Sequence, residues 1–73
     1  STTFAITVPH RAHVRLTLYD LLGREAAVLF DGVREAGLQT VTFNASGLSS
    51  GIYFARLESA GTIYGLRKII LLK

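Results

Sequence analysis

The 73-residue chain contains no cysteine, no methionine and no tryptophan, and its single proline is Pro9. Without cysteine it can form neither a disulfide nor a thiolate metal site. Its two histidines, His10 and His13, are too few to complete a four-ligand zinc site by themselves. No apolar run approaches the roughly 20 residues that a membrane-spanning helix needs. We therefore expect a small domain that depends on its hydrophobic core alone and has modest stability.

Charge is also sparse, because charged residues make up 18% of the chain and the net charge is +3. The cations are scattered, and the only adjacent pair is Arg67 and Lys68. Nucleic-acid binders usually cluster their cations along one face, so we do not expect nucleic-acid binding. The chain has neither an initiator methionine nor a signal peptide. We interpret residues 1–73 as one domain, an excised or processed piece of a longer protein in which any export signal lies elsewhere.

Alternating apolar and polar residues predict short β-strands within residues 4–8, 14–19, 40–43 and 52–57. Residues 26–30 are apolar throughout and too few for a typical helix. Turn signals separate these segments, including Asp20–Gly23, in which Gly23 can adopt a positive φ, and the pair Asp31–Gly32. The pattern predicts an all-β domain, an antiparallel sandwich of six to seven short strands, with a small barrel as the alternative.

The phase of the last two strands is less uniform. Arg56 shares a phase with Ile52 and Phe54, which predicts that the opposite row, Tyr53, Ala55 and Leu57, faces the core. In the final segment Arg67 interrupts one phase and Lys68 the other, whereas residues 69–72 are apolar on both. A β-bulge near Arg67 and Lys68, or a strand buried on both faces, would reconcile the pattern.

Several motifs that often carry chemistry lack their structural context here. Residues 47–51 match G-x-S-x-G, but a strand follows where a hydrolase needs a helix, so we interpret Ser49 as a turn residue. His10 and His13 have no third ligand nearby, and the five acids are dispersed. We expect no catalytic residue, no metal and no cofactor, and hence no enzyme.

Two surface functions have weaker signals. Residues 44–46 fit the N-glycosylation pattern, although Asn44 is more readily an Asx-turn residue. Tyr19, Tyr53 and Tyr64 would line a sugar-binding platform if all three rings were exposed. Aromatic residues spread over different strands are more often part of the core or half-buried.

Taken in order, residues 14–25, 38–44, 48–57 and 67–73 resemble one known family across nearly the whole chain. That family is the C-terminal sorting domain of bacterial type IX secretion substrates, also called the Por secretion tail. The block at residues 48–57 is the most specific part of the resemblance. The Ig-like domain of flagellar hook-capping proteins has a similar strand pattern and a similar Ser-Gly-Ile/Val-Tyr block. The aliphatic-lysine end of this chain favours the sorting domain.

The resemblance implies a seven-stranded Ig-like sandwich at the end of a secreted parent enzyme or adhesin. It also implies recognition by the outer-membrane type IX secretion machinery. Removal of the domain, or its exchange for attachment to surface lipopolysaccharide, would then follow. The residues that match the family's signal strand are Lys68, Ile69, Ile70, Leu71, Leu72 and Lys73, and those expected to be structural are Gly23, Gly51 and Tyr53. Family members usually begin with an additional Asn-Pro-containing strand, which this chain starts too late to include.

The predicted function is therefore a non-catalytic sorting signal, with localisation at the cell surface or outside the cell. An apolar strand at a sheet edge exposes backbone donors and acceptors that another protein can engage by strand addition. Two alternatives stay open from the sequence. One is an Ig-like structural or assembly module like the hook-capping relatives, and the other is a carbohydrate-binding accessory module of an extracellular enzyme.

Overall fold

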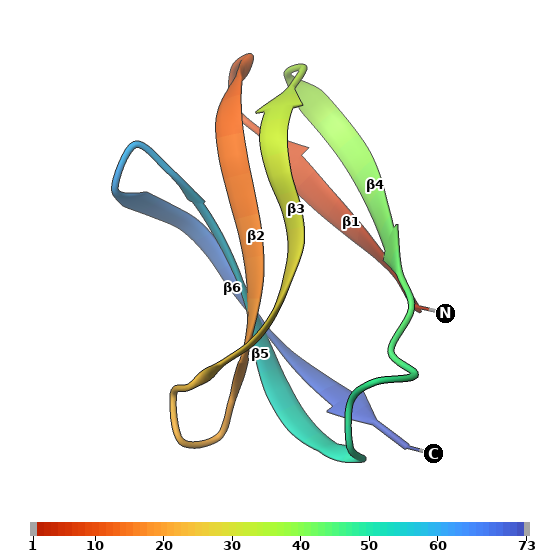
Figure 1. Cartoon of the computed structure of the whole chain (residues 1–73). Coiled ribbons are helices and arrows are strands. Elements are labelled where there is room, and N and C mark those ends of the chain that lie inside the picture. Colours follow the sequence, from red (N-terminus) through yellow and green to blue (C-terminus); the bar gives the residue numbers. More distant parts are fainter. Residues whose placement is uncertain (1, 73) are drawn as a thin grey trace.

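The computed structural model describes the backbone of residues 2–72 and the side chains of residues 3 and 5–72. Every regular element in this range is a β-strand (Figure 1). The six strands are β1 (Thr2–Val8), β2 (Ala12–Asp20), β3 (Glu25–Arg34), β4 (Gly37–Phe43), β5 (Gly51–Ser59) and β6 (Thr62–Leu71).

The strands form two antiparallel sheets that face each other (Figure 1). The small sheet has the order β1-β4 and the large sheet the order β3-β2-β5-β6. Contacts between β3 and β4 close one side of the sandwich. The opposite side is bordered by the edge strands β1 and β6. This architecture confirms the predicted all-β, small Ig-like sandwich, with six strands in the part of the chain that is described.

The core lies between the two sheets and is built from alternate residues of each strand. On β5 the predicted inward row is confirmed, since Tyr53, Ala55 and Leu57 are 8%, 5% and 5% exposed. The other buried apolar residues are Val8, Val14, Leu16, Leu18, Val41, Ile69 and Leu71. Full burial of one aliphatic side chain stabilises the fold by about 1.5–3 kcal/mol. The buried side chains between the two sheets are therefore the main source of stability.

The predicted turn at Asp31–Gly32 is wrong, because both residues continue β3. Their partners on β2 are Arg15 and Val14. Pairing along the length of β2 outweighs the local turn preference of the two residues. The chain reverses instead just after Arg34, and β4 begins at Gly37.

Neither explanation of the mixed pattern in the last strand, a β-bulge near Arg67 and Lys68 or burial on both faces, is correct. The β5–β6 register runs without interruption from Gly51↔Leu71 to Leu57↔Gly65, and its only shift lies between Leu57 and Glu58. The irregularity therefore lies at Tyr64, which has no partner on β5, and not at Arg67 and Lys68. Nor is the strand buried on both faces, because the outer face of the large sheet has no covering layer among the described residues.

The β2–β3 connection is the predicted hairpin turn, and Asp20 holds it together. The Asp20 carboxylate accepts hydrogen bonds from the backbone N–H of Leu22 at 2.9 Å and that of Arg24 at 3.0 Å. The Arg24 guanidinium pairs with the other carboxylate oxygen at 3.0 Å. Gly23 has a φ of +81°, which side chains with a Cβ rarely adopt.

These contacts predict a pH-dependent stability. The backbone N–H of Arg24 chiefly, followed by the Arg24 side chain and the N–H of Leu22, holds the pKa of Asp20 below its ordinary 3.8. A pKa lowered by folding adds stability above the unfolded-state pKa, and this stability is lost as the pH falls through the folded-state pKa. We expect Asp20→Asn to destabilise the domain at pH 7, and this difference to shrink when the pH is lowered to 2, below the ordinary carboxyl pKa of 3.8. Urea unfolding across this range measures the difference, and an equal gap at both pH values would contradict the assignment.

Candidate functional site

The candidate site is the end of β6, where the sequence places the six residues of the predicted signal. Within the described structure, β6 pairs only with β5 and so forms one edge of the large sheet. Ile69 and Leu71 face the core and are 9% and 7% exposed. Ile70 faces outward and is 59% exposed, and Leu72, which follows the last residue of β6, is 88% exposed. Lys68 is exposed, and Lys73 lies outside the described residues.

The inward half of this run is held by the start of β5. Ile69 pairs with Tyr53, and Leu71 pairs with Gly51. The Tyr53 hydroxyl donates a 2.7 Å hydrogen bond to the carbonyl oxygen of Ser49, four residues upstream. This contact has the form of a tyrosine corner, in which a tyrosine at the start of a strand fastens the preceding loop. Ile69 and Leu71 are therefore anchoring residues.

Gly51 begins β5 with a φ of +156°, at the margin of the range that L side chains rarely adopt. A Cβ on Gly51 would lie 4.0 Å from Cε2 of the Tyr53 ring, an ordinary van der Waals distance. The backbone angle, and not lack of space, thus favours glycine here. Gly51 and Tyr53 together set the path by which the chain enters β5.

The outward half of the run combines apolar side chains with an unpaired strand edge. The backbone N–H and C=O groups on the outer edge of β6 have no strand partner in the described structure, which makes the edge a template for strand addition. An edge of this kind offers the backbone groups that strand addition uses.

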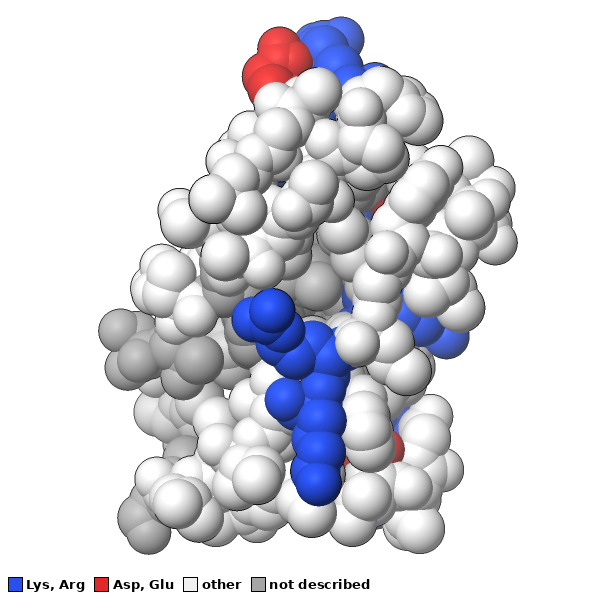
Figure 2. Space-filling model, turned by 180° about the vertical axis from the view of Figure 1, so that it is seen from behind, with Lys and Arg blue, Asp and Glu red and all other residues white. Residues whose placement is uncertain are grey.

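The positive charges of Arg67 and Lys68 on β6 have no ion-pair partner among the described residues. Each of the chain's five acids is engaged elsewhere, in the pairs Arg11–Glu35, His13–Asp31, Arg15–Glu25, Arg24–Asp20 and Arg56–Glu58. No carboxylate in the described structure lies within ion-pairing distance of Arg67 or Lys68. Figure 2 shows Lys and Arg side chains near the middle of one face of the molecule. Arg67 and Lys68 contribute two positive charges to β6.

The structure places the other sequence candidates apart from this edge. Ser49 is exposed and lies in the loop that leads into β5. A strand therefore follows it, where a nucleophile elbow requires a helix. His13 contacts Asp31, and the described residues contain no group of three potential metal ligands. The Asn44 side chain accepts a 2.9 Å hydrogen bond from the backbone N–H of Ser46, which confirms the predicted Asx turn.

The three tyrosines do not share one surface. Tyr53 is buried in the core. Tyr19 lies on the outer face of the large sheet, where the Arg56 guanidinium stacks on its ring and contacts its hydroxyl. Tyr64 lines a different hollow, between the two sheets. The aromatic platform that the carbohydrate-binding alternative needs is not formed.

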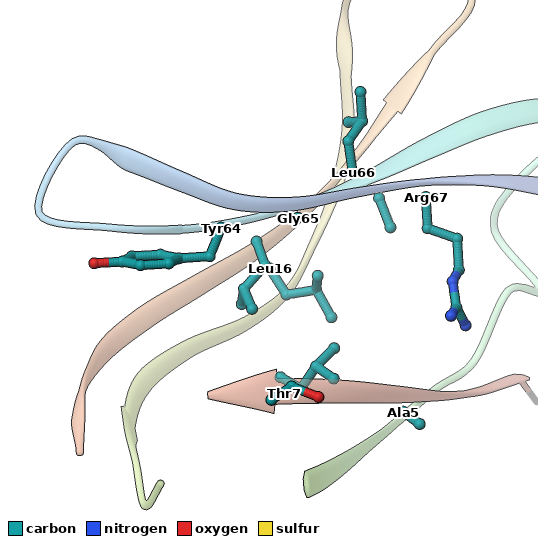
Figure 3. Close-up of a pocket in the computed structure, with 10 residues that line it drawn as sticks. Ala5, Thr7, Leu16, Tyr64, Gly65, Leu66 and Arg67 are labelled. Atoms are coloured by element: carbon teal, nitrogen blue, oxygen red, sulfur yellow. The ribbon is translucent and has the colours of Figure 1, made fainter. Parts of the chain in front are cut away.

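Arg67 has a position that was not predicted. It lies in the inward phase of β6 with Gly65 and Ile69 and lines a groove beside β1 (Figure 3). In the sequence this position is marked by a cation in an otherwise apolar phase. The sequence alone predicts a bulge there, because the pairing of Arg67 with Ala55 on β5 is visible only in the structure.

The family comparison agrees with the resemblance drawn from the sequence. The family described as the secretion system C-terminal sorting domain matches residues 1–72, and the chain belongs to this family. No curated protein and no solved structure matches the chain.

Membership of this family has direct consequences. The domain carries a type IX secretion sorting signal for a parent protein to which it is attached, and that parent is secreted. Sorting domains of this family are generally non-catalytic. Within the described residues, no helix has the length and apolarity to cross a membrane.

The tyrosine corner gives a stability prediction. Tyr53→Phe removes the hydroxyl that bonds the Ser49 carbonyl, and we expect it to lower the free energy of unfolding by about 1 kcal/mol. Tyr64→Phe is the matched control, because the same atom is removed from a ring that is 43% exposed. Urea unfolding of the two variants measures the difference. Equal stability of Tyr53→Phe and the unmodified domain would show that the contact does not stabilise the fold.

Proposed function

We propose that residues 1–73 form a C-terminal sorting domain whose residues Lys68, Ile69, Ile70, Leu71, Leu72 and Lys73 are recognised by the outer-membrane type IX secretion machinery. The observation that carries this proposal is the division of the run at the edge of the large sheet. Its inward residues are anchored in the core, whereas Ile70 and Leu72 are exposed beside an unpaired backbone edge.

Strand addition is the form of recognition that this edge supports. A partner strand seated on β6 would form backbone hydrogen bonds and place its own side chains beside the outward ones. Full burial of an aliphatic side chain contributes about 1.5–3 kcal/mol, and partial shielding of Ile70 and Leu72 contributes less than this for each. Lys68 and Arg67 oppose pairing between two copies of β6, since like charges on adjacent strands repel. The edge thus favours a foreign partner over a second copy.

The domain has no catalytic part in this proposal. It stays attached to a parent enzyme or adhesin during export across the outer membrane. It is then removed, or it is exchanged for attachment to lipopolysaccharide at the cell surface. These later steps rest on the family resemblance.

Export of a reporter tests the assignment. Residues 1–73 are fused behind a signal peptide and a reporter in a bacterium with type IX secretion. Deletion of residues 68–73 should abolish release of the reporter. If the reporter leaves the cell equally well without these residues, the signal lies elsewhere.

Because the deletion also removes the buried residues Ile69 and Leu71, point variants separate recognition from folding. The double variant Ile70→Ser/Leu72→Ser changes only exposed side chains and should reduce export about tenfold or more at unchanged stability. Leu66→Ser is the matched control, since Leu66 is 65% exposed on the same strand but lies outside the run. Full export by the double variant, or an equal loss with Leu66→Ser, would contradict the proposal.

A further inference from the structure

The turn between β2 and β3 displays two leucines where turns usually carry polar residues. Its Asp20 and Gly23 are ordinary turn residues, but both positions between them are leucine. Leu21 and Leu22 are 64% and 77% exposed. Neither belongs to the core or to the partly buried side chains that pack against it. Two adjacent leucines are therefore held in water without serving the fold.

The backbone of this turn is fixed by hydrogen bonds within the turn itself. The N–H of Asp20 donates to the carbonyl oxygen of Arg24 at 2.9 Å, and the N–H of Gly23 donates to the carbonyl oxygen of Asp20 at 3.0 Å. The Asp20 carboxylate accepts the N–H groups of Leu22 and Arg24 and forms an ion pair with the Arg24 side chain. The two leucines thus lie on a backbone whose path is set before any partner binds.

These contacts make the tip of the turn easy to cover. Burial of a backbone N–H without a hydrogen-bond partner destabilises a complex. The N–H groups of Leu22, Gly23 and Arg24 already have partners inside the turn. A surface that covers the tip therefore removes little hydrogen bonding to water, and it orders little flexible backbone. The gain from apolar contact with the leucines is kept.

The turn lies at the same end of the large sheet as the end of β6 (Figure 1). Asp20, Tyr53 and Ile69 form one row across β2, β5 and β6. Leu21 lines a hollow on the outer face of this sheet, the face to which Ile70 points. A protein that engages the outward side of the end of β6 therefore has the turn within reach.

The size and charge of the tip favour a protein pocket over a lipid surface. A single myristoyl chain gives only marginal membrane binding, and two leucine side chains together are smaller than one such chain. Two anchors held in one geometry are matched instead to a pocket of fixed shape. Because Arg24 already neutralises Asp20, the turn requires no opposite charge on its partner. A second copy is disfavoured, since two copies of a domain with a net charge of +3 repel one another.

We propose that the β2–β3 turn is a second contact with the type IX secretion machinery, in which Leu21 and Leu22 enter an apolar pocket on a protein of the outer membrane. Membership of the sorting-domain family supplies this partner, and the turn adjoins the end of β6 at which the sorting signal is proposed. The inference therefore rests on the proposed function for the identity of the partner. It does not depend on the assignment of residues 68–73, because the turn shares no residue with them.

Export of the reporter fusion measures what the turn contributes. Leu22→Ser should reduce export about fivefold or more, because an apolar anchor is lost, and Leu22→Met should restore it by keeping the apolar surface. Leu38→Ser is the matched control, since Leu38 is 74% exposed and lies on β4 in the small sheet. It should leave export unchanged. Urea unfolding should be the same for all three variants, so that a loss of export reports a lost contact.

Photo-crosslinking of the exported fusion identifies the partner. A crosslinking residue at position 22 should give a product with an outer-membrane component of the machinery, and one at position 38 should give none. Products from position 70 but not from position 22 would overturn this inference alone. Products from position 22 but not from position 70 would contradict the assignment of residues 68–73 and leave the turn as a contact.

Three further results would overturn the inference. The first is full export by Leu22→Ser, and the second is an equal loss with Leu38→Ser. The third is crosslinking from position 22 only to lipid, to the parent protein or to a second copy of the domain, which would identify another occupant of the tip.

Discussion

The alternation of side chains along β5 is the constraint on which the rest of the structure depends. β5 lies between β2 and β6, and its inward row of Tyr53, Ala55 and Leu57 contacts the core from the middle of the large sheet. A shift of one residue would turn this whole row outward, so the register is strongly specified. The hydrogen bond from Tyr53 to Ser49 fastens the point at which β5 begins.

The register of β5 also decides what β6 presents. Because Tyr53 pairs with Ile69, every second residue of the final run faces the core, and the residues between them face outward. The same stretch is therefore both structural and available for recognition. On the proposed assignment the outward residues are presented only by the folded domain, since the unfolded chain does not hold Ile70 beside a sheet edge.

Much of this fold can be predicted from local chemistry. Arg56 marks the outward phase of β5, and Asp20 with Gly23 marks a hairpin turn, because in each case a residue's own properties determine its surroundings. The resemblance to the sorting domain also follows from such blocks. Asp31 and Gly32 mislead for the opposite reason: their place in β3 is set by pairing with a distant strand.

The site is harder to predict than the fold because it depends on sheet order. Residues 69–72 are apolar on both faces, and the sequence does not say that only one face is covered. That outcome follows because the outer face of the large sheet has no covering layer among the described residues, and the exposed backbone edge follows because β6 is the last strand of that sheet. The inward position of Arg67 likewise depends on the β5–β6 register, in which Arg67 pairs with the buried Ala55.

The central claim is that the outward side of the end of β6 contacts the secretion machinery. Photo-crosslinking in a bacterium with type IX secretion tests it most directly, with the crosslinking residue at position 70 of the exported fusion. Position 28 is the reference, because Val28 is 43% exposed on β3, at the other edge of the same sheet. The account predicts crosslinks to an outer-membrane component of the machinery from position 70 and none from position 28. Equal crosslinking from both positions, or crosslinking from position 28 alone, would contradict it.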